Sequence, residues 1–326
     1  MSDWRYRLAQ NRATLLAIFF FLVMFAIYAS NHPAGFSANV VQTAANKGVL
    51  LALVAMAQAF VVITAGIDLS VGAVFVLTNC LASWIVVGTA WTAGLGVAGV
   101  LLTGLACGAV NGLIVIVGRL QPIVTTIATG AVFFGLALLL RPTPGGDVFG
   151  PLADALTGRA LVVLPASLVA LAVVVLVIWI PYRRSAIGRA AYAVGSSEQA
   201  AFMSGVPVDR AKFFAYVLSG LSASLGGLFL TFVTYSGEAS AANGGTYTLY
   251  SIAAVVLGGV SLFGGSGSAI GAIFGALMFR TIGDLLFVFN LEPLWQPLFQ
   301  GLVLLAAVVL GGARLFQVRN RLELFP

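Results

Sequence analysis

The chain has 326 residues, and only 26 of them are charged: 16 are Lys or Arg and 10 are Asp or Glu. That is 8% of the chain, against about 25% in an ordinary soluble domain. Because 60% of the residues are hydrophobic, the remaining charge cannot cover a surface of this size in water. The composition excludes a soluble enzyme, a nucleic-acid-binding protein and a disordered protein, and it predicts an integral membrane protein.

Long charge-free stretches predict a single all-α domain, residues 1–326, with about ten transmembrane helices, since each crossing needs about 20 apolar residues. The first stretch follows a basic leader, but it is long for a signal peptide and no clear cleavage site follows it. We therefore expect it to be retained as a helix. The predicted spans lie near 13–30, 47–65, 70–88, 92–117, 122–140, 161–181, 212–234, 249–263, 268–288 and 297–313.

The positions of the basic residues predict the orientation of these helices. With the N-terminus in the cytoplasm, an even number of spans returns the C-terminus to the same side. Twelve of the sixteen basic residues then face the cytoplasm, three face the outside and Arg280 lies within a span. This excess follows the rule that cytoplasmic loops are rich in Lys and Arg, and it also favours contact with anionic lipid headgroups.

Two connections are longer than the others. The outside loop, about 141–160, is rich in Pro and Gly, whereas the inside loop, about 181–212, is the most hydrophilic segment of the chain. Within the inside loop we expect a short helix over 197–204, because Ser196 and Gln199 have the spacing of a capping box.

Further residues of this inside loop support the short helix. Glu198 would lie in its first turn, where a negative charge suits the helix dipole. Gly205 would supply a left-handed C-terminal cap, and Pro207 would prevent continuation. The helix, with Ser197 at its start, would expose Phe202 and Met203. It is either a solvated connector or a docking element for a cytoplasmic partner.

Asp68 is the only charged residue between Gly48 and Gly118. An ionisable residue at membrane depth is costly and suggests a role in a gate or a pathway. The alternative is structural, because Asp68 precedes the third span and has the right chemistry to cap the N-terminus of a helix.

Other polar residues fall within or beside the predicted spans, and each can line an aqueous pathway or bond two helices together. The candidates for the pathway, besides Asp68, are Asn79, Asn111, Gln121 and Thr126. Arg280 and Asp284 are four residues apart on the ninth span, which predicts an ion pair inside the membrane.

Nothing in the sequence indicates catalysis. The chain has one His and two Cys, and it contains neither a phosphate-binding loop nor a cluster with metal-ligand spacing. We therefore expect no metal, no cofactor and no ATPase site in this chain.

Four ordered segments carry a family resemblance: 66–72 (GIDLSVG), 111–129, 188–206 and 252–265 (IAAVVLGGVSLFGG). They resemble the permease subunits of ribose-, xylose- and galactose-type ABC importers. The resemblance implies a multi-pass protein of the bacterial inner membrane that moves a monosaccharide or small polyol by alternating access.

The resemblance also implies partners. They are a second permease half, a periplasmic sugar-binding protein and a cytoplasmic ABC ATPase that holds ATP and Mg and engages the loop matching 188–206. The alternative is a stand-alone transporter driven by an ion gradient, which would use Asp68, or Arg280 with Asp284, as its ion-coupled element. No nucleic-acid partner is expected.

Overall fold

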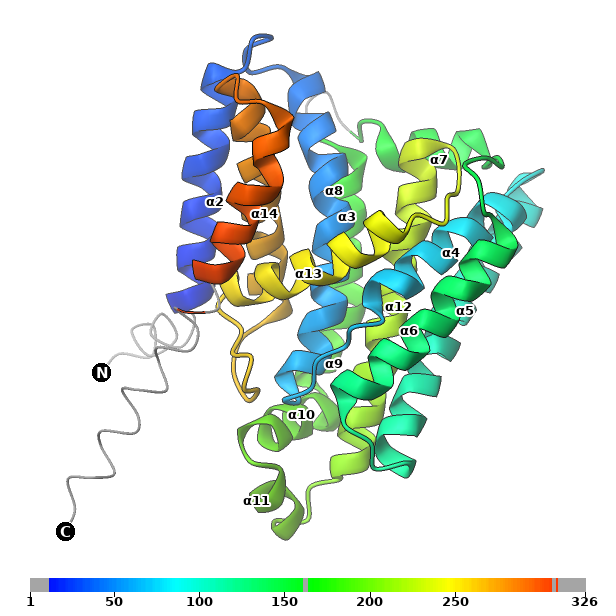
Figure 1. Ribbon diagram of the computed structural model, residues 1–326, viewed down its shortest axis with the longest axis vertical. Coiled ribbons are helices and arrows are strands. Elements are labelled where there is room, and N and C mark those ends of the chain that lie inside the picture. Colours follow the sequence, from blue (N-terminus) through cyan, green and yellow to red (C-terminus); the bar gives the residue numbers. More distant parts are fainter. Residues whose placement is uncertain (1–11, 161–163, 307–308, 310–326) are drawn as a thin grey trace, which may run out of the picture.

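The computed structural model describes residues 12–160, 164–306 and 309, and these residues form helices joined by turns and two isolated β-bridges (Figure 1). The predicted all-α class is therefore confirmed. The elements are α2 (Arg12–Asn31), α3 (Ala38–Ile63), α4 (Val71–Ile85), α5 (Ala90–Val117), α6 (Pro122–Leu140), α7 (Gly150–Thr157), α8 (Ala166–Val174), a π-turn (Val175–Trp179), α9 (Ile180–Arg184), α10 (Ala186–Ser196), α11 (Glu198–Met203), α12 (Val208–Thr234), α13 (Ala241–Leu257), α14 (Ala269–Val288) and a 3-10 turn (Pro293–Trp295).

Seven helical segments are long and apolar enough to cross a membrane: α2, α3, α5, α6, the run from α8 to α9, α12 and α14. Three shorter apolar helices, Val71–Ile85, Gly244–Leu257 and Gln296–Ala306, overlap the remaining predicted spans. Length and composition thus establish a multi-pass α-helical membrane protein, with seven segments of full spanning length among the described residues where ten were predicted. The predicted orientation depends partly on the two terminal segments, which lie outside the described residues.

Several helix ends differ from the predicted spans because local caps decide them. The second helix begins at Ala38 instead of 47, since the Ser37 hydroxyl accepts a hydrogen bond from the Val40 amide. Lys47 therefore lies inside α3. The span predicted at 249–263 instead ends at Leu257, before the left-handed Gly259 (φ +76°).

Small residues hold the helices together at close range. The central α3 is buried along most of its length, and α12 packs against α3, α4 and α5. A Cβ added at Gly220 of α12 would lie 2.1 Å from the carbonyl oxygen of Gly104 in α5. Only glycine fits at such an approach, which is the packing that small residues allow between membrane helices.

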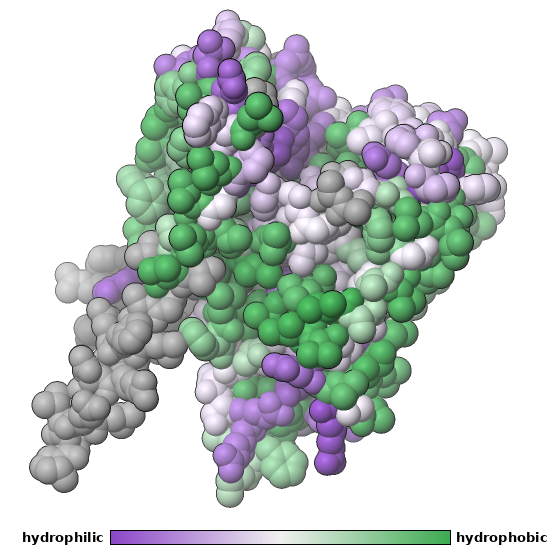
Figure 2. Space-filling model, viewed as in Figure 1, coloured by the Kyte–Doolittle hydropathy of each residue, from purple (hydrophilic) through white to green (hydrophobic). Residues whose placement is uncertain are grey.

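The arrangement has two chemically distinct ends. Helices α10 and α11 form one end, and the α2–α3 turn lies at the other, while α13 runs across the other helices between them (Figure 1). Figure 2 shows apolar side chains over the middle of the visible face and hydrophilic ones gathered towards both ends. This distribution is typical of a bundle with its middle in lipid and its ends in water.

Candidate functional site

The short helix α11 forms as predicted, but with a different N-terminal cap. Its N-cap is Ser197, whose hydroxyl accepts a hydrogen bond from the Ala200 amide (3.3 Å). The predicted capping box of Ser196 with Gln199 is wrong, because α10 extends through Ser196 and its hydroxyl donates to the Tyr192 carbonyl (2.9 Å). Of two adjacent serines, only the one with an extended backbone (φ −165°) can cap.

The C-terminal end of α11 places two apolar side chains in contact with solvent. Gly205 adopts the predicted left-handed conformation (φ +76°) and its amide donates to the Phe202 carbonyl (3.0 Å). Phe202 is 72% exposed and Met203 is 80% exposed, whereas Ala201 between helix and bundle is 5% exposed. The helix therefore rests on the bundle through Ala201 and presents its large apolar residues outwards.

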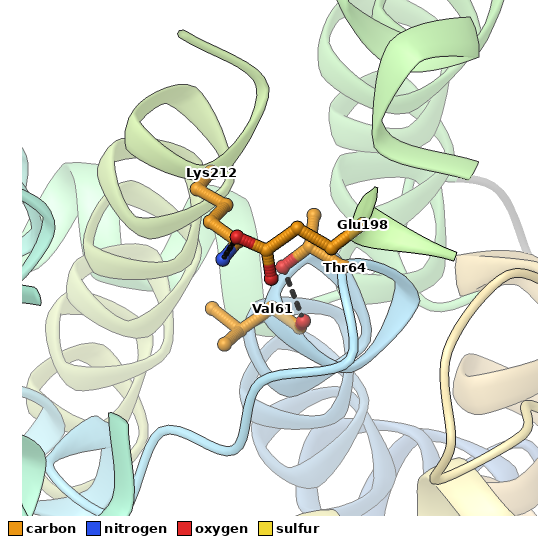
Figure 3. A network of polar contacts seen from close by, with 4 residues as sticks. All are labelled: Val61, Thr64, Glu198 and Lys212. Atoms are coloured by element: carbon orange, nitrogen blue, oxygen red, sulfur yellow. Dashed lines mark hydrogen bonds and ion pairs between the residues drawn. The ribbon is translucent and has the colours of Figure 1, made fainter. Parts of the chain in front are cut away.

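Glu198 forms an ion pair with a membrane helix of its own chain. Its carboxylate lies 2.6 Å from Nζ of Lys212 in α12, so the two side chains point towards each other (Figure 3). In the same view, Thr64 Oγ1 donates to the Val61 carbonyl and closes the end of α3 (2.8 Å). The pair joins the start of α11 to the first turns of α12, and this internal role was not predicted.

A second contact joins α10 to the Gly-rich turn between α13 and α14. Tyr192 Oη donates to the Gly267 carbonyl (2.7 Å). A Cβ at Gly195 would lie 1.9 Å from the Ile63 carbonyl oxygen, which itself accepts from the Gly265 amide (3.0 Å). A displacement of α10 and α11 must therefore move the end of α3 and the 258–267 turn as well.

The Glu198–Lys212 pair leads to a prediction about coupling. If the cytoplasmic ATPase that the resemblance implies docks on α11, Glu198→Arg should place two cations side by side, tilt α11 away from α12 and reduce recovery of that ATPase with the purified chain. The charge-swapped double variant, Glu198→Lys with Lys212→Glu, should restore that recovery. Loss in both variants would instead mean that Glu198 contacts the ATPase directly, and normal recovery in the single variant would contradict any role in coupling.

Asp68 lies at the centre of a buried hydrogen-bond network. The residue is 2% exposed, and its Oδ1 accepts from the Ser70 amide (2.9 Å) and the Ser70 hydroxyl (2.6 Å). Oδ2 accepts from the Ser219 hydroxyl of α12 (3.0 Å). The side-chain amide of Gln58 in α3 is oriented so that both its nitrogen and its oxygen have partners. The nitrogen donates to the Asp68 carbonyl, and the oxygen accepts from the Asp68 amide.

The network continues through two further predicted candidates. Asn111 of α5 donates to the Ser70 hydroxyl (2.7 Å) and accepts from Thr129 of α6 (2.6 Å). Thr126 Oγ1 accepts from the Leu69 amide (2.9 Å). These bonds hold the 66–70 connection against α3, α5, α6 and α12. The structural interpretation of Asp68 is favoured, although it bonds to Ser70, the N-cap residue itself, rather than to the first turn of α4.

Asn79 makes a separate set of hydrogen bonds, in which both its side-chain nitrogen and its side-chain oxygen have partners. Its amide donates to Thr231 of α12 (2.9 Å), and its side-chain oxygen accepts from the Glu238 amide (3.0 Å). It joins α4 to α12 and to the turn that follows. Gln121 differs from the others, because it is exposed at the N-cap of α6 and makes no side-chain cap.

Arg280 and Asp284 share one face of α14, but they do not close the predicted ion pair. Within the described ranges, the charged groups that lie within 4.0 Å of each other are those of Lys212 and Glu198. Arg280 and Asp284 instead line a common cavity of about 890 Å³ together with Lys47 of α3. The sequence showed Lys47 only as a lone charge, and it could not place this residue opposite α14.

The described part of the chain contains no group of three His, Cys, Asp or Glu side chains placed to hold a metal. Cys80 and Cys107 are both free and buried.

Comparison with known proteins shows the family to which the chain belongs. Residues 40–308 match the family described as the permease component of branched-chain amino acid transport systems. The chain belongs to this family of ABC-importer permeases. Permease subunits of this kind carry no ATPase site, and the ATPase is a separate subunit.

Individual relatives agree with this assignment. The chain is 39% identical to a probable ABC transporter permease protein of Sinorhizobium fredii, over 84% of this chain and 80% of the relative. It is 34% identical to the ribose import permease of Bacillus subtilis, over 79% and 80%. It is 29% identical to the D-allose transport system permease of Escherichia coli, over 90% and 89%. No solved structure matches the chain.

Proposed function

We propose that this chain is one permease half of an ATP-driven importer in a bacterial inner membrane, and that it moves a monosaccharide or similar small polyol by alternating access. The relatives that carry the names ribose and D-allose support the substrate class. The whole chain would act as one domain with ten crossings and both termini in the cytoplasm. The excess of basic residues on one side supports that orientation.

The observation that carries this proposal is the exposed pair Phe202–Met203 on a helix that is bonded to the bundle. The two apolar side chains offer a contact for a cytoplasmic ATPase, since the largest apolar residues of α11 are mostly exposed. Closure of the ATPase would push α11, and the contacts of Tyr192 and Gly195 would carry the movement to the 258–267 turn. A periplasmic binding protein would deliver the solute at the opposite end, and a second permease half would complete the pore.

The rival mechanism, a transporter driven by an ion gradient, loses its main candidate. Both carboxylate oxygens of Asp68 accept hydrogen bonds from hydroxyl or amide donors, which favours a role in holding the helices together over one in binding a coupling ion. Arg280 and Asp284 are better explained by the cavity that they share.

Energy dependence distinguishes the two mechanisms. In cells that express the permease with its ATPase and binding protein, we expect uptake of radiolabelled sugar to continue when a protonophore collapses the proton gradient and ATP is maintained. The cause is that ATP hydrolysis alone drives the cycle. Uptake should stop when the catalytic base of the ATPase is removed. If uptake instead follows the gradient and ignores the ATPase variant, the importer assignment fails.

A further inference from the structure

A cavity of about 890 Å³ lined by both charged and apolar residues lies between α2, α3 and α14. Its lining includes His32, Ala34 and Ser37 of the α2–α3 turn. That turn lies at the opposite end of the bundle from α11 (Figure 1). Its charged residues are Lys47, Arg280, Asp284 and Glu292, and His32 lies beside them. A volume of this size falls in the range of about 300–1,000 Å³ that small-molecule pockets occupy.

Two of these charges lie at the same depth in facing helices. Lys47 is nine residues from the first residue of α3, and Arg280 is eight residues from the last residue of α14. At about 1.5 Å per residue, both lie roughly 12–14 Å below the same end of the bundle. Ionisable residues at such a depth face a bundle interior or a water-filled cavity, and they mark the pathways of solutes.

One polar group of this cavity has no partner, although it belongs to a charged side chain. Nε of Arg280 is buried and has no hydrogen-bond partner in the described structure. Arg280 and Lys47 both lie close enough to Asp284 to attract its carboxylate, yet neither forms an ion pair within 4.0 Å of it. A buried N–H without an acceptor is unfavourable, so an oxygen atom from a bound molecule would lower the free energy of this site.

The charge balance of the cavity indicates the kind of molecule that fits. Lys47 and Arg280 contribute two positive charges, and Asp284 and Glu292 contribute two negative ones, so the formal charges cancel. A charged solute would leave the cavity as a whole with a net formal charge, the exposed Glu292 included. A neutral molecule with several hydroxyl groups leaves none, because each hydroxyl donates to a carboxylate and accepts from a cation.

We propose that this cavity is a binding station for a neutral polyhydroxylated solute on its way through the permease. Arg280 and Lys47 supply the donors, Asp284 and Glu292 supply the acceptors, and Tyr28 also lines the cavity. The inference rests on the proposed function and makes it more specific, because it assigns selectivity to α14 and α3 rather than to Asp68, Asn79 or Asn111.

The first test asks whether the cavity is open to water from outside. Thr43→Cys lines the cavity, and the native Cys80 and Cys107 are buried, so they give little background. In the complete importer in right-side-out vesicles, a small membrane-impermeant thiol reagent should label Thr43→Cys at least about tenfold faster than Thr78→Cys, which is fully buried in α4. Equal, slow labelling of both would overturn the proposal.

The second test measures transport by the reconstituted importer with D-ribose, D-allose and the acid D-ribonate as probes. Arg280→Gln and Asp284→Asn should each lower uptake of the neutral sugar at least about tenfold, since each loses a hydrogen bond to a charged group worth about 1.5–3 kcal/mol. ATP hydrolysis stimulated by the loaded binding protein should stay close to wild type. The matched control is Asp147→Asn, an exposed carboxylate that accepts from the Val148 amide in the outside loop.

Each other outcome overturns the inference in its own way. Unchanged uptake would remove Arg280 and Asp284 from the path of the solute. A parallel fall in stimulated ATP hydrolysis would assign them to the scaffold, and preferential uptake of ribonate would exclude a neutral solute. A wild-type importer without any ATP-dependent uptake would show that the proposed function itself has failed.

Discussion

Replacing both Phe202 and Met203 with Asp should abolish stable binding of the ATPase subunit while leaving the permease folded. Burying a large apolar side chain contributes about 1.5–3 kcal/mol, so two of them account for an affinity change of at least about a hundredfold. Both side chains are mostly exposed, so their replacement removes little packing within the chain. Recovery of the ATPase with tagged permease in detergent is the measurement.

A matched control separates this effect from general damage. Leu294→Asp makes the same kind of change at an apolar residue that is 85% exposed, in the 3-10 turn far from α11. It should leave recovery of the ATPase unchanged. Normal recovery with the Phe202/Met203 double variant would contradict the docking role, and equal loss in the control would show that any added charge disturbs the complex.

Replacing Asp68 with Ala should strongly destabilise the permease. The change leaves the Ser70 amide, the Ser70 hydroxyl and the Ser219 hydroxyl without their acceptor. At about 1–3 kcal/mol for each unsatisfied buried group, the loss is a large share of the roughly 5–15 kcal/mol that stabilises a typical domain. The midpoint of thermal aggregation in detergent should fall by at least about 5 °C.

Two weaker variants test the same network. Asp68→Asn keeps one acceptor oxygen, and Ser219→Ala removes only the single contact to Oδ2, so thermal stability should decrease in the order wild type, Ser219→Ala, Asp68→Asn, Asp68→Ala. Stability equal to wild type in Asp68→Ala, combined with a loss of transport, would contradict the structural role and restore Asp68 as part of a gate.

The fate of Asp68 shows why polar residues in spans are hard to interpret from a sequence. Asp68, Asn79 and Asn111 are chemically suited both to a pathway and to bonds between helices. Two of the three have a partner more than a hundred residues away in the chain: Ser219 for Asp68 and Thr231 for Asn79. Only the packing of α12 against α4 brings those partners within hydrogen-bond distance.

The sequence by itself determined the membrane class, most of the helices and the position of the short helix α11. The physical reason is that these features depend on local composition: charge-free runs of membrane length, and Gly205 at a left-handed cap. Local rules failed at the N-cap of α11, where Ser196 and Ser197 are both chemically suitable. Because α10 extends through Ser196, Ser197 is the cap.

The tertiary structure alone decided which polar groups are already satisfied and which are free to bind. Lys47 and Arg280 are more than two hundred residues apart, and they share a cavity only because α3 and α14 pack side by side. Whether a buried polar group has hydrogen-bond partners depends on neighbours from distant parts of the chain. It therefore cannot be predicted from one position in the sequence. Among the few charges of this chain, Glu198 and Lys212 join α11 to the bundle, Asp68 is held by serine donors, and Lys47, Arg280 and Asp284 line a cavity.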